Sequence, residues 1–116
     1  MDNILDTMKE DAVDYGSKYQ TKRTVMVIKK DGSKEEFNVQ KVINAVGKSA
    51  YRALTKFSTE EKERICQYVV DKVNEIDKDE IPIPIMHNIV ESGLEKVKPI
   101  VAKSYRDYRN YKQDFV

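Results

Sequence analysis

The chain has 116 residues, of which 40% are hydrophobic and 35% are charged, and its formal net charge is +1. This length and composition are typical of one helix-rich globular domain. The near balance of 21 basic and 20 acidic residues argues against binding mainly to phosphate backbone, which usually requires a clear basic excess. No apolar run approaches the roughly 18–20 residues of a membrane span, and the first residues lack a secretion signal, so we expect a cytoplasmic protein.

The chain has one cysteine and one histidine, and these low numbers exclude several kinds of site. Cys66 is the only cysteine, which rules out a disulfide framework, a CxxC pair and a cysteine zinc site. His87 is the only histidine, which rules out a site that needs two imidazoles. The four glycines form neither of the two common phosphate-binding loops. Taken alone, Cys66 is expected to be an inert thiol beside a helix core, and His87 a packed or surface side chain.

Residues 1–23 are polar and acid-rich, with weak helical periodicity through Ile4, Leu5 and Met8. We interpret them as an acidic arm or frayed helix outside the core, with a boundary at residues 16–18.

The stretch VIKKDGSKEEFNVQKV, residues 27–42, predicts a β-hairpin that leads into a helix. Thr24 to Lys30 is rich in β-branched residues, Asp31-Gly32 is a strong turn signal, and residues 34–37 return. A three-residue loop would place Val27, Lys29 and Glu35 on one face, whereas a two-residue loop would separate Lys29 from Glu35. We favour the three-residue loop because it gives an apolar base with one charged pair at its tip.

Four helices are expected after the hairpin. Asn38 is a favourable N-cap for the first helix, and Ser58-Thr59-Glu60-Glu61 is a capping box for the second. Residues 77–84 are interpreted as a linker whose second proline starts the third helix, and Pro99 starts the fourth. The predicted fold class is α+β, mostly α: a two-stranded hairpin lid over a bundle of about four helices, with a cleft between them.

Two lysines make the start of the first long helix a candidate anion site. Lys29 ends the first strand and Lys41 lies in the first helical turn, where backbone N–H groups and the helix dipole already favour negative charge. A triphosphate would suit this arrangement. The alternative is that Lys29 and Glu35 form only an exposed cross-strand ion pair, which contributes about 0.2–1 kcal/mol.

The segment KSYRDYRNYK, residues 103–112, alternates basic residues with tyrosines at helical spacing. One hypothesis is a stacking and phosphate-binding surface for single-stranded nucleic acid. The alternative is a helix whose tyrosines pack inward while its basic residues face water. Asp107 and Asp114 dilute the positive charge and count against nucleic acid.

Three blocks in this order resemble the ATP-cone family: VIKKDGSKEEFNVQKV, IPIPIMHNIVESGL and VAKSYRDYR. Members of this family are nucleotide-binding regulatory modules, found mainly at the amino end of ribonucleotide reductases and also in a related transcriptional repressor. The hairpin is a lid in that family, and ATP or dATP lies beneath it over a helical bundle. The prolines at positions 82 and 84 depart from the family pattern, which is commonly polar there.

The resemblance implies a role for each matching residue. It places Val27 near the base, Lys29 and Lys41 at the phosphates, and Glu35 and Asn38 around the nucleoside and the lid. It also places Met86 and His87 beside the nucleotide, with Lys103 and Arg109 in a terminal block whose basic residues can reach phosphates. The implied ligand is ATP or dATP, with or without Mg²⁺.

We therefore expect a domain that regulates a ribonucleotide reductase through adenine nucleotides and has no catalysis of its own. Residues 24–113 would form the ATP-cone, and residues 114–116 would start a linker to a catalytic domain. The expected partners are adenine nucleotide and the reductase's catalytic domain or subunits, in a nucleotide-dependent oligomer, without membrane and without nucleic acid. The competing hypothesis is a small nucleic-acid-binding module that uses the tyrosine- and arginine-rich helix.

Overall fold

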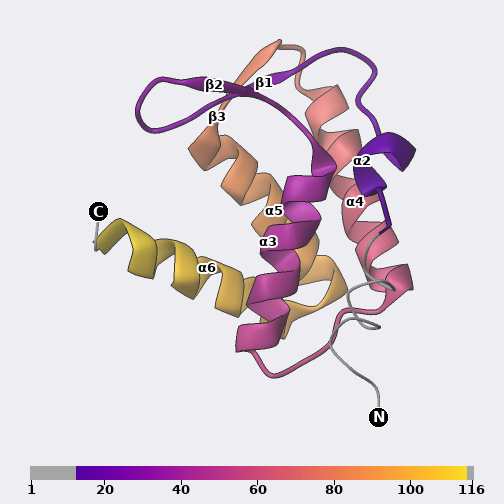
Figure 1. The fold of residues 1–116 in the computed structure, drawn as a ribbon, viewed down its shortest axis with the longest axis vertical. Coiled ribbons are helices and arrows are strands. Elements are labelled where there is room, and N and C mark those ends of the chain that lie inside the picture. The colour runs from indigo at the N-terminus through magenta and orange to yellow at the C-terminus, as the bar shows by residue number, and fades with distance from the viewer. Residues whose placement is uncertain (1–12, 115–116) are drawn as a thin grey trace.

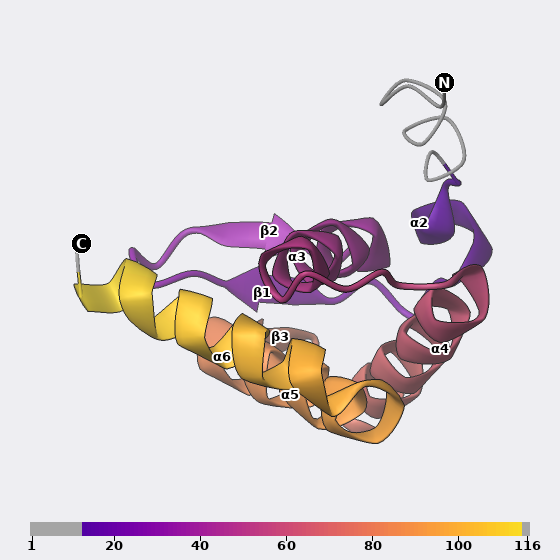
Figure 2. The same ribbon diagram turned by 90° about the horizontal axis from the view of Figure 1, so that it is seen from below.

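The computed structural model describes residues 13–114, and side chains through residue 108. The elements in chain order are α2 (Tyr15–Lys18), β1 (Met26–Ile28), β2 (Lys34–Glu36), α3 (Val39–Arg52), α4 (Thr59–Glu75), β3 (Glu80–Pro82), α5 (Ile83–Val97) and α6 (Pro99–Asp114). In this part of the chain the four long helices form a ring in which α3, α4, α5 and α6 each pack against the next, and α6 closes against α3. The small sheet lies across one end of that ring (Figures 1 and 2). The predicted α+β, mostly α class is confirmed.

The hairpin has the predicted three-residue-loop register. Val27 pairs with Glu35 and Ile28 pairs with Lys34. Gly32 has a φ of +88°, a left-handed conformation that glycine adopts without a Cβ clash, and its N–H donates to the Lys29 carbonyl over 2.9 Å. Asp31 accepts hydrogen bonds from the hydroxyl and the backbone N–H of Ser33, and these bonds lower the pKa of its carboxyl group.

The interpretation of residues 77–84 as a linker is wrong in one part. Glu80–Pro82 forms β3, which pairs in parallel with β1, so the sheet has three strands in the order β2-β1-β3. Ile81 is buried in the sheet at 1% exposure. Pro82 is tolerated because β3 is an edge strand.

The predicted helix starts are confirmed. The Asn38 side chain accepts a hydrogen bond from the Gln40 N–H and thereby caps α3. Ser58 and Glu61 form the full capping box of α4, each side chain accepting from the other residue's backbone N–H. Helix α5 begins at Ile83 with a proline in its first turn. Because α3 follows β2 and α5 follows β3, both helices start at the sheet.

The interpretation of residues 1–23 as lying outside the core is wrong for Tyr15. Its side chain is only 2% exposed, and its backbone N–H donates to the Gln40 side chain over 2.8 Å. The neighbouring Gly16 passes so close to Asn38 that an added Cβ would lie 2.3 Å from the Asn38 Oδ1. Residues 14–18 therefore dock on the start of α3. The rest of the predicted arm, residues 1–12, and residues 115–116 of the predicted tail lie outside the described residues.

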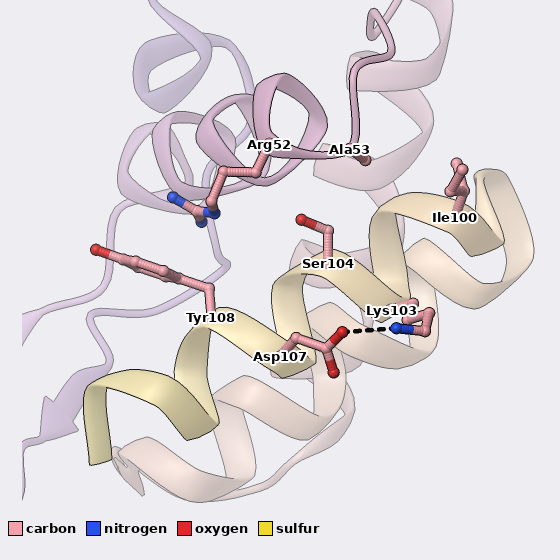
Figure 3. Close-up of a pocket in the computed structure, with 7 residues that line it drawn as sticks. All are labelled: Arg52, Ala53, Ile100, Lys103, Ser104, Asp107 and Tyr108. Carbon is pink, nitrogen blue, oxygen red and sulfur yellow. Dashed lines mark hydrogen bonds and ion pairs between the residues drawn. The ribbon is translucent and has the colours of Figure 1, made fainter. Parts of the chain in front are cut away.

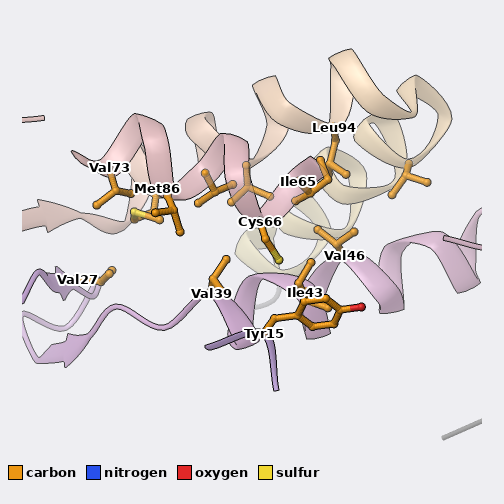
Figure 4. Close-up of a cluster of buried hydrophobic side chains, with 14 of the residues drawn as sticks. Tyr15, Val27, Val39, Ile43, Val46, Ile65, Cys66, Val73, Met86 and Leu94 are labelled. Atoms are coloured by element: carbon orange, nitrogen blue, oxygen red, sulfur yellow. The ribbon is translucent and has the colours of Figure 1, made fainter. Parts of the chain in front are cut away.

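The core lies between the helices and extends beneath the sheet (Figure 4). Its largest part comes from the valine- and isoleucine-rich faces of α3 and α4, which meet Met86, Val90 and Leu94 of α5. Cys66 is fully buried in this core, and burial raises the pKa of its thiol to about 12, which fits the predicted inert role. None of the helices between residues 13 and 114 combines the length and apolar character needed to traverse a bilayer.

The turn after α3 contains a residue in an unfavourable backbone conformation. Leu54 has a φ of +56°, and its side chain is 94% exposed. The N–H of Leu54 donates to the Tyr51 carbonyl, and the N–H of Thr55 donates to the Ala50 carbonyl. This is the Schellman pattern, in which the position of Leu54 usually carries glycine.

We predict that Leu54→Gly stabilises the fold. The left-handed conformation costs a non-glycine residue about 1–2 kcal/mol, which glycine avoids, while the greater freedom of glycine in the unfolded chain offsets about 0.5–1 kcal/mol. Thermal unfolding followed by circular dichroism should show a melting temperature about 2–5 °C higher. Thr55→Gly, at the next position, should lower it; an equal or lower melting temperature for Leu54→Gly would contradict the account.

Candidate functional site

A cavity of about 180 Å³ lies beneath the hairpin, between the sheet and the helices. It is bounded by β1 and β2 above, by the first two turns of α3 and of α5, and by one side chain of α6. The lining residues are Val27, Glu35, Glu36, Phe37, Asn38, Lys41, Val42, Ala45, Ile83, Met86, His87, Val90 and Tyr105.

Helical spacing explains why α3 and α5 each present several residues to this cavity. On α3 the N-cap Asn38 is followed at intervals of three or four residues by Lys41 or Val42 and then Ala45. On α5 the same spacing runs from Ile83 to Met86 or His87 and then to Val90. Helix α3 therefore contributes polar groups near its start and apolar groups deeper inside, whereas α5 contributes mainly apolar groups together with His87.

The Glu35 carboxylate joins the two lysines that the sequence singled out. Its Oε2 lies 2.9 Å from the Nζ of Lys29, and its Oε1 forms an ion pair with the Nζ of Lys41. The Glu35 side chain is 28% exposed, whereas those of Lys29 and Lys41 are 50% and 64% exposed. Two cationic groups thus converge at the rim of the cavity around one carboxylate.

Two helix ends reinforce this positive potential. Helices α3 and α5, of 14 and 15 residues, both begin beside the cavity, where the unpaired N–H groups of a first turn carry partial positive charge. The N-cap of α5 is Pro82, which makes no side-chain cap hydrogen bond. The rim of the cavity is therefore suited to an anion, and its interior to an apolar or aromatic group.

The structure brings six of the nine predicted site residues to this one cavity: Val27, Glu35, Asn38, Lys41, Met86 and His87. Lys29 is connected to it through its ion pair with Glu35. The register that pairs Val27 with Glu35 places these residues on the same face of the hairpin, as the three-residue loop predicts. The side chain of Arg109 lies outside the described residues.

Lys103 lies elsewhere, in a groove of about 650 Å³ between the end of α3 and α6 (Figure 3). Its Nζ lies 2.8 Å from the Asp107 Oδ2, one helical turn away. In the same groove the Arg52 guanidinium stacks on the Tyr108 ring at 3.5 Å from the centroid. Lys103 is thus not among the residues that line the cavity beneath the hairpin.

Sequence reasoning assigned the apolar residues Val27 and Met86 to the site but not the rest of its aromatic and aliphatic lining. Tyr105 was interpreted only as a packing or stacking residue of the last helix, yet its ring meets the His87 ring edge-on at 6.1 Å and borders the cavity. Phe37 and Ile83 also line it. Helical spacing could have identified part of this lining, because Ile83, His87 and Val90 share one face of α5.

Comparison with known proteins identifies the family. Residues 25–114 match the family described as the ATP cone domain. The chain belongs to the ATP-cone family. It is thus an ATP-cone nucleotide-binding regulatory domain, a kind of domain that binds adenine nucleotides and has no catalysis of its own.

Proteins of two kinds are among those similar to this chain. The transcriptional repressor NrdR of Limosilactobacillus fermentum is 29% identical over 90 residues, covering 74% of this chain and 58% of the repressor. The NrdR of Streptococcus gordonii is 30% identical over 91 residues, covering 78% and 57%. The anaerobic ribonucleoside-triphosphate reductase of Haemophilus influenzae is 37% identical over 86 residues, covering 72% of this chain and 12% of the reductase. The chain thus matches a little more than half of each repressor and a small part of the reductase.

We predict that Lys103→Ala leaves ATP affinity within about twofold of the unchanged protein, because the Lys103 ammonium lies in the α3–α6 groove and is paired with Asp107. Isothermal titration calorimetry with ATP measures this directly. A loss of tenfold or more would place the phosphates near the groove rather than beneath the hairpin.

Proposed function

We propose that the cavity beneath the hairpin binds ATP or dATP and that the domain regulates a ribonucleotide reductase. The observation that supports this most directly is the convergence of Lys29 and Lys41 on one carboxylate at the rim of a cavity that Met86 and His87 line. Cations at the rim suit phosphates, and the apolar and aromatic interior suits a purine base.

In this arrangement the phosphates lie at the rim and the nucleoside lies inside. Lys29 and Lys41 donate to phosphate oxygens, while the adenine ring packs against Met86 and the His87–Tyr105 pair. Glu35 and Asn38 supply the polar contacts between these two regions. In the described part of the chain no group of three or more histidine, cysteine or acidic side chains is placed to hold a metal ion, so Mg²⁺ would arrive with the triphosphate.

The size of the cavity connects binding to movement of the hairpin. Its volume of about 180 Å³ is below the roughly 300 Å³ at which ligand pockets usually begin. A nucleotide enclosed here would need a wider cavity, and we propose that the hairpin moves away from α5 to provide it. A ligand that displaces the hairpin changes the surface that the sheet presents to neighbouring subunits. This change of surface would transmit nucleotide binding to the rest of the assembly.

Regulation requires that ATP and dATP favour different states. The two ligands differ only at the ribose 2′-hydroxyl, so they can control an activity only through different affinities for two conformations or oligomers. We propose that the alternative states are assemblies of the reductase, with its catalytic domain or subunits as partners. The likeness to the anaerobic reductase of Haemophilus influenzae supports this choice.

A second candidate is a nucleotide-responsive domain of a transcriptional repressor. Several NrdR repressors match the chain at 28–30% identity, which favours this alternative. In the described part of α6, however, the basic side chains are paired with acidic ones: Lys103 with Asp107, and Arg106 with Glu91 at 2.7 Å. Each of these cations has acidic partners of its own, whereas Lys29 and Lys41 converge on one carboxylate, so this helix is the poorer phosphate-binding surface, and any contact with DNA would have to come from elsewhere.

Adenine nucleotide should stabilise the domain through the two lysines at the rim. ATP or dATP at 100 times the dissociation constant adds about 2.7 kcal/mol to the free energy of unfolding, which a thermal melt detects. Lys29→Ala and Lys41→Ala should each weaken ATP binding about tenfold, because each removes a charge-assisted bond to phosphate. Both affinities are measured by calorimetry.

Lys30→Ala is the matched control for Lys29→Ala and Lys41→Ala. Lys30 carries the same charge and neighbours Lys29, but it lies in the exposed turn and is not one of the two lysines that pair with Glu35. It should change ATP affinity less than twofold. Equal losses from all three variants would indicate only a general positive field, and an unchanged melting temperature with ATP and dATP would refute nucleotide binding.

The nucleic-acid alternative makes a different prediction. If α6 bound single-stranded DNA, affinity would fall steeply with salt, by a slope of about −0.7 per phosphate contacted. We expect no such binding at 150 mM salt in a fluorescence anisotropy titration with a labelled oligonucleotide. Tight binding that Arg106→Ala abolishes would support the alternative instead.

A further inference from the structure

Glu35 occupies the position at which the proposed function places phosphate oxygens. Each of its two carboxylate oxygens pairs with a different lysine, Lys29 at the end of β1 and Lys41 in the first turn of α3. A carboxylate with two oxygens and one negative charge resembles part of a phosphate group in both shape and charge. The pairing thus satisfies the same donors that a nucleotide would need.

We propose that Glu35 is an internal counter-ion, which the phosphates of a nucleotide must displace from Lys29 and Lys41. This inference rests on the proposed function. It assigns Glu35 a role in setting the affinity for the phosphate chain, apart from any contact with the nucleoside.

The hairpin register fixes Glu35 in this position. Glu35 pairs with Val27 in the β-ladder, so its side chain is on the face of the hairpin that lines the cavity. The Glu35 side chain, at 28% exposure, is less accessible to water than the side chain of either lysine. Water therefore screens its attraction to the lysines less than it would screen a fully exposed pair.

Displacement has two consequences. A phosphate that binds while the carboxylate stays in place meets a like charge within a few ångströms, which weakens binding. A phosphate that replaces the carboxylate breaks the ion pairs through which Glu35 joins β2 to β1 and to α3. Binding of phosphate thereby removes the ion pair that holds the hairpin to the start of α3.

Inorganic tripolyphosphate is the probe for this role, because it carries the phosphate chain without a nucleoside. Glu35→Gln keeps the size of the side chain and removes its charge. Because the variant removes the charge that competes with phosphate for both lysines, it should bind tripolyphosphate about three- to tenfold more tightly by calorimetry. Glu35→Asp, which keeps the charge on a shorter side chain, should remain closer to the unchanged protein.

Glu80→Gln is the matched control. Glu80 lies on β3 in the same sheet and pairs with Lys34 over 2.6 Å, and neither residue lines the cavity. The substitution removes the same charge, so tripolyphosphate affinity should change less than twofold. Thermal melts of each variant establish that differences in binding do not come from loss of the fold.

The outcomes separate the inference from the proposed function. If the unchanged protein binds ATP but Glu35→Gln binds tripolyphosphate equally or more weakly, the counter-ion role is refuted and the proposed function stands. An equal gain for Glu35→Gln and Glu80→Gln also refutes the role, because the effect is then one of net charge. If the unchanged protein does not bind ATP, the proposed function fails, and the inference fails with it.

Discussion

The register of the β1–β2 hairpin is the constraint on which the rest of the site depends. Pairing Val27 with Glu35 places an apolar and an acidic side chain at the same cavity. A shift of one residue in this pairing would place Val27 and Glu35 on opposite faces of the hairpin and separate the Glu35 carboxylate from Lys29. The register is fixed locally, by the left-handed Gly32 and the Asp31–Ser33 hydrogen bonds, and the third strand supports it from the other edge.

Sequence reasoning predicted those features whose causes are local. The turn residues, the Asn38 cap and the capping box at Ser58 each identify their element by themselves, and all three occur as expected. The cross-strand ion pair between Lys29 and Glu35, which the sequence offered as the alternative to an anion site, also forms. The ion pair and the anion site are compatible, because a counter-ion is what converging cations require in the absence of a phosphate.

The features that were missed depend on contacts between distant segments. β3 has three residues, two of them exposed and one a proline, so no periodicity distinguishes it from a linker. It becomes a strand only because β1 offers a free edge. The burial of Tyr15 depends on the Gln40 side chain, 25 residues away, and the place of Tyr105 at the cavity depends on the packing of α6 against α3 and α5.

The structure supports a sensor whose ligand competes with the protein's own ion pairs. The ATP-cone family assigns the class of ligand, while the choice between a reductase and a repressor depends on segments that the chain does not share with those relatives. A domain of this kind needs no catalytic group. It needs a ligand whose binding changes the contacts between the sheet and α3.

A crystal structure of the chain with ATP tests this account most directly. The account predicts that the phosphates lie within hydrogen-bonding distance of the Lys29 and Lys41 ammonium groups, that the Glu35 carboxylate has left them, and that adenine lies against Met86 and His87. A nucleotide bound in the α3–α6 groove of Figure 3, with the Glu35 ion pairs intact, would contradict it.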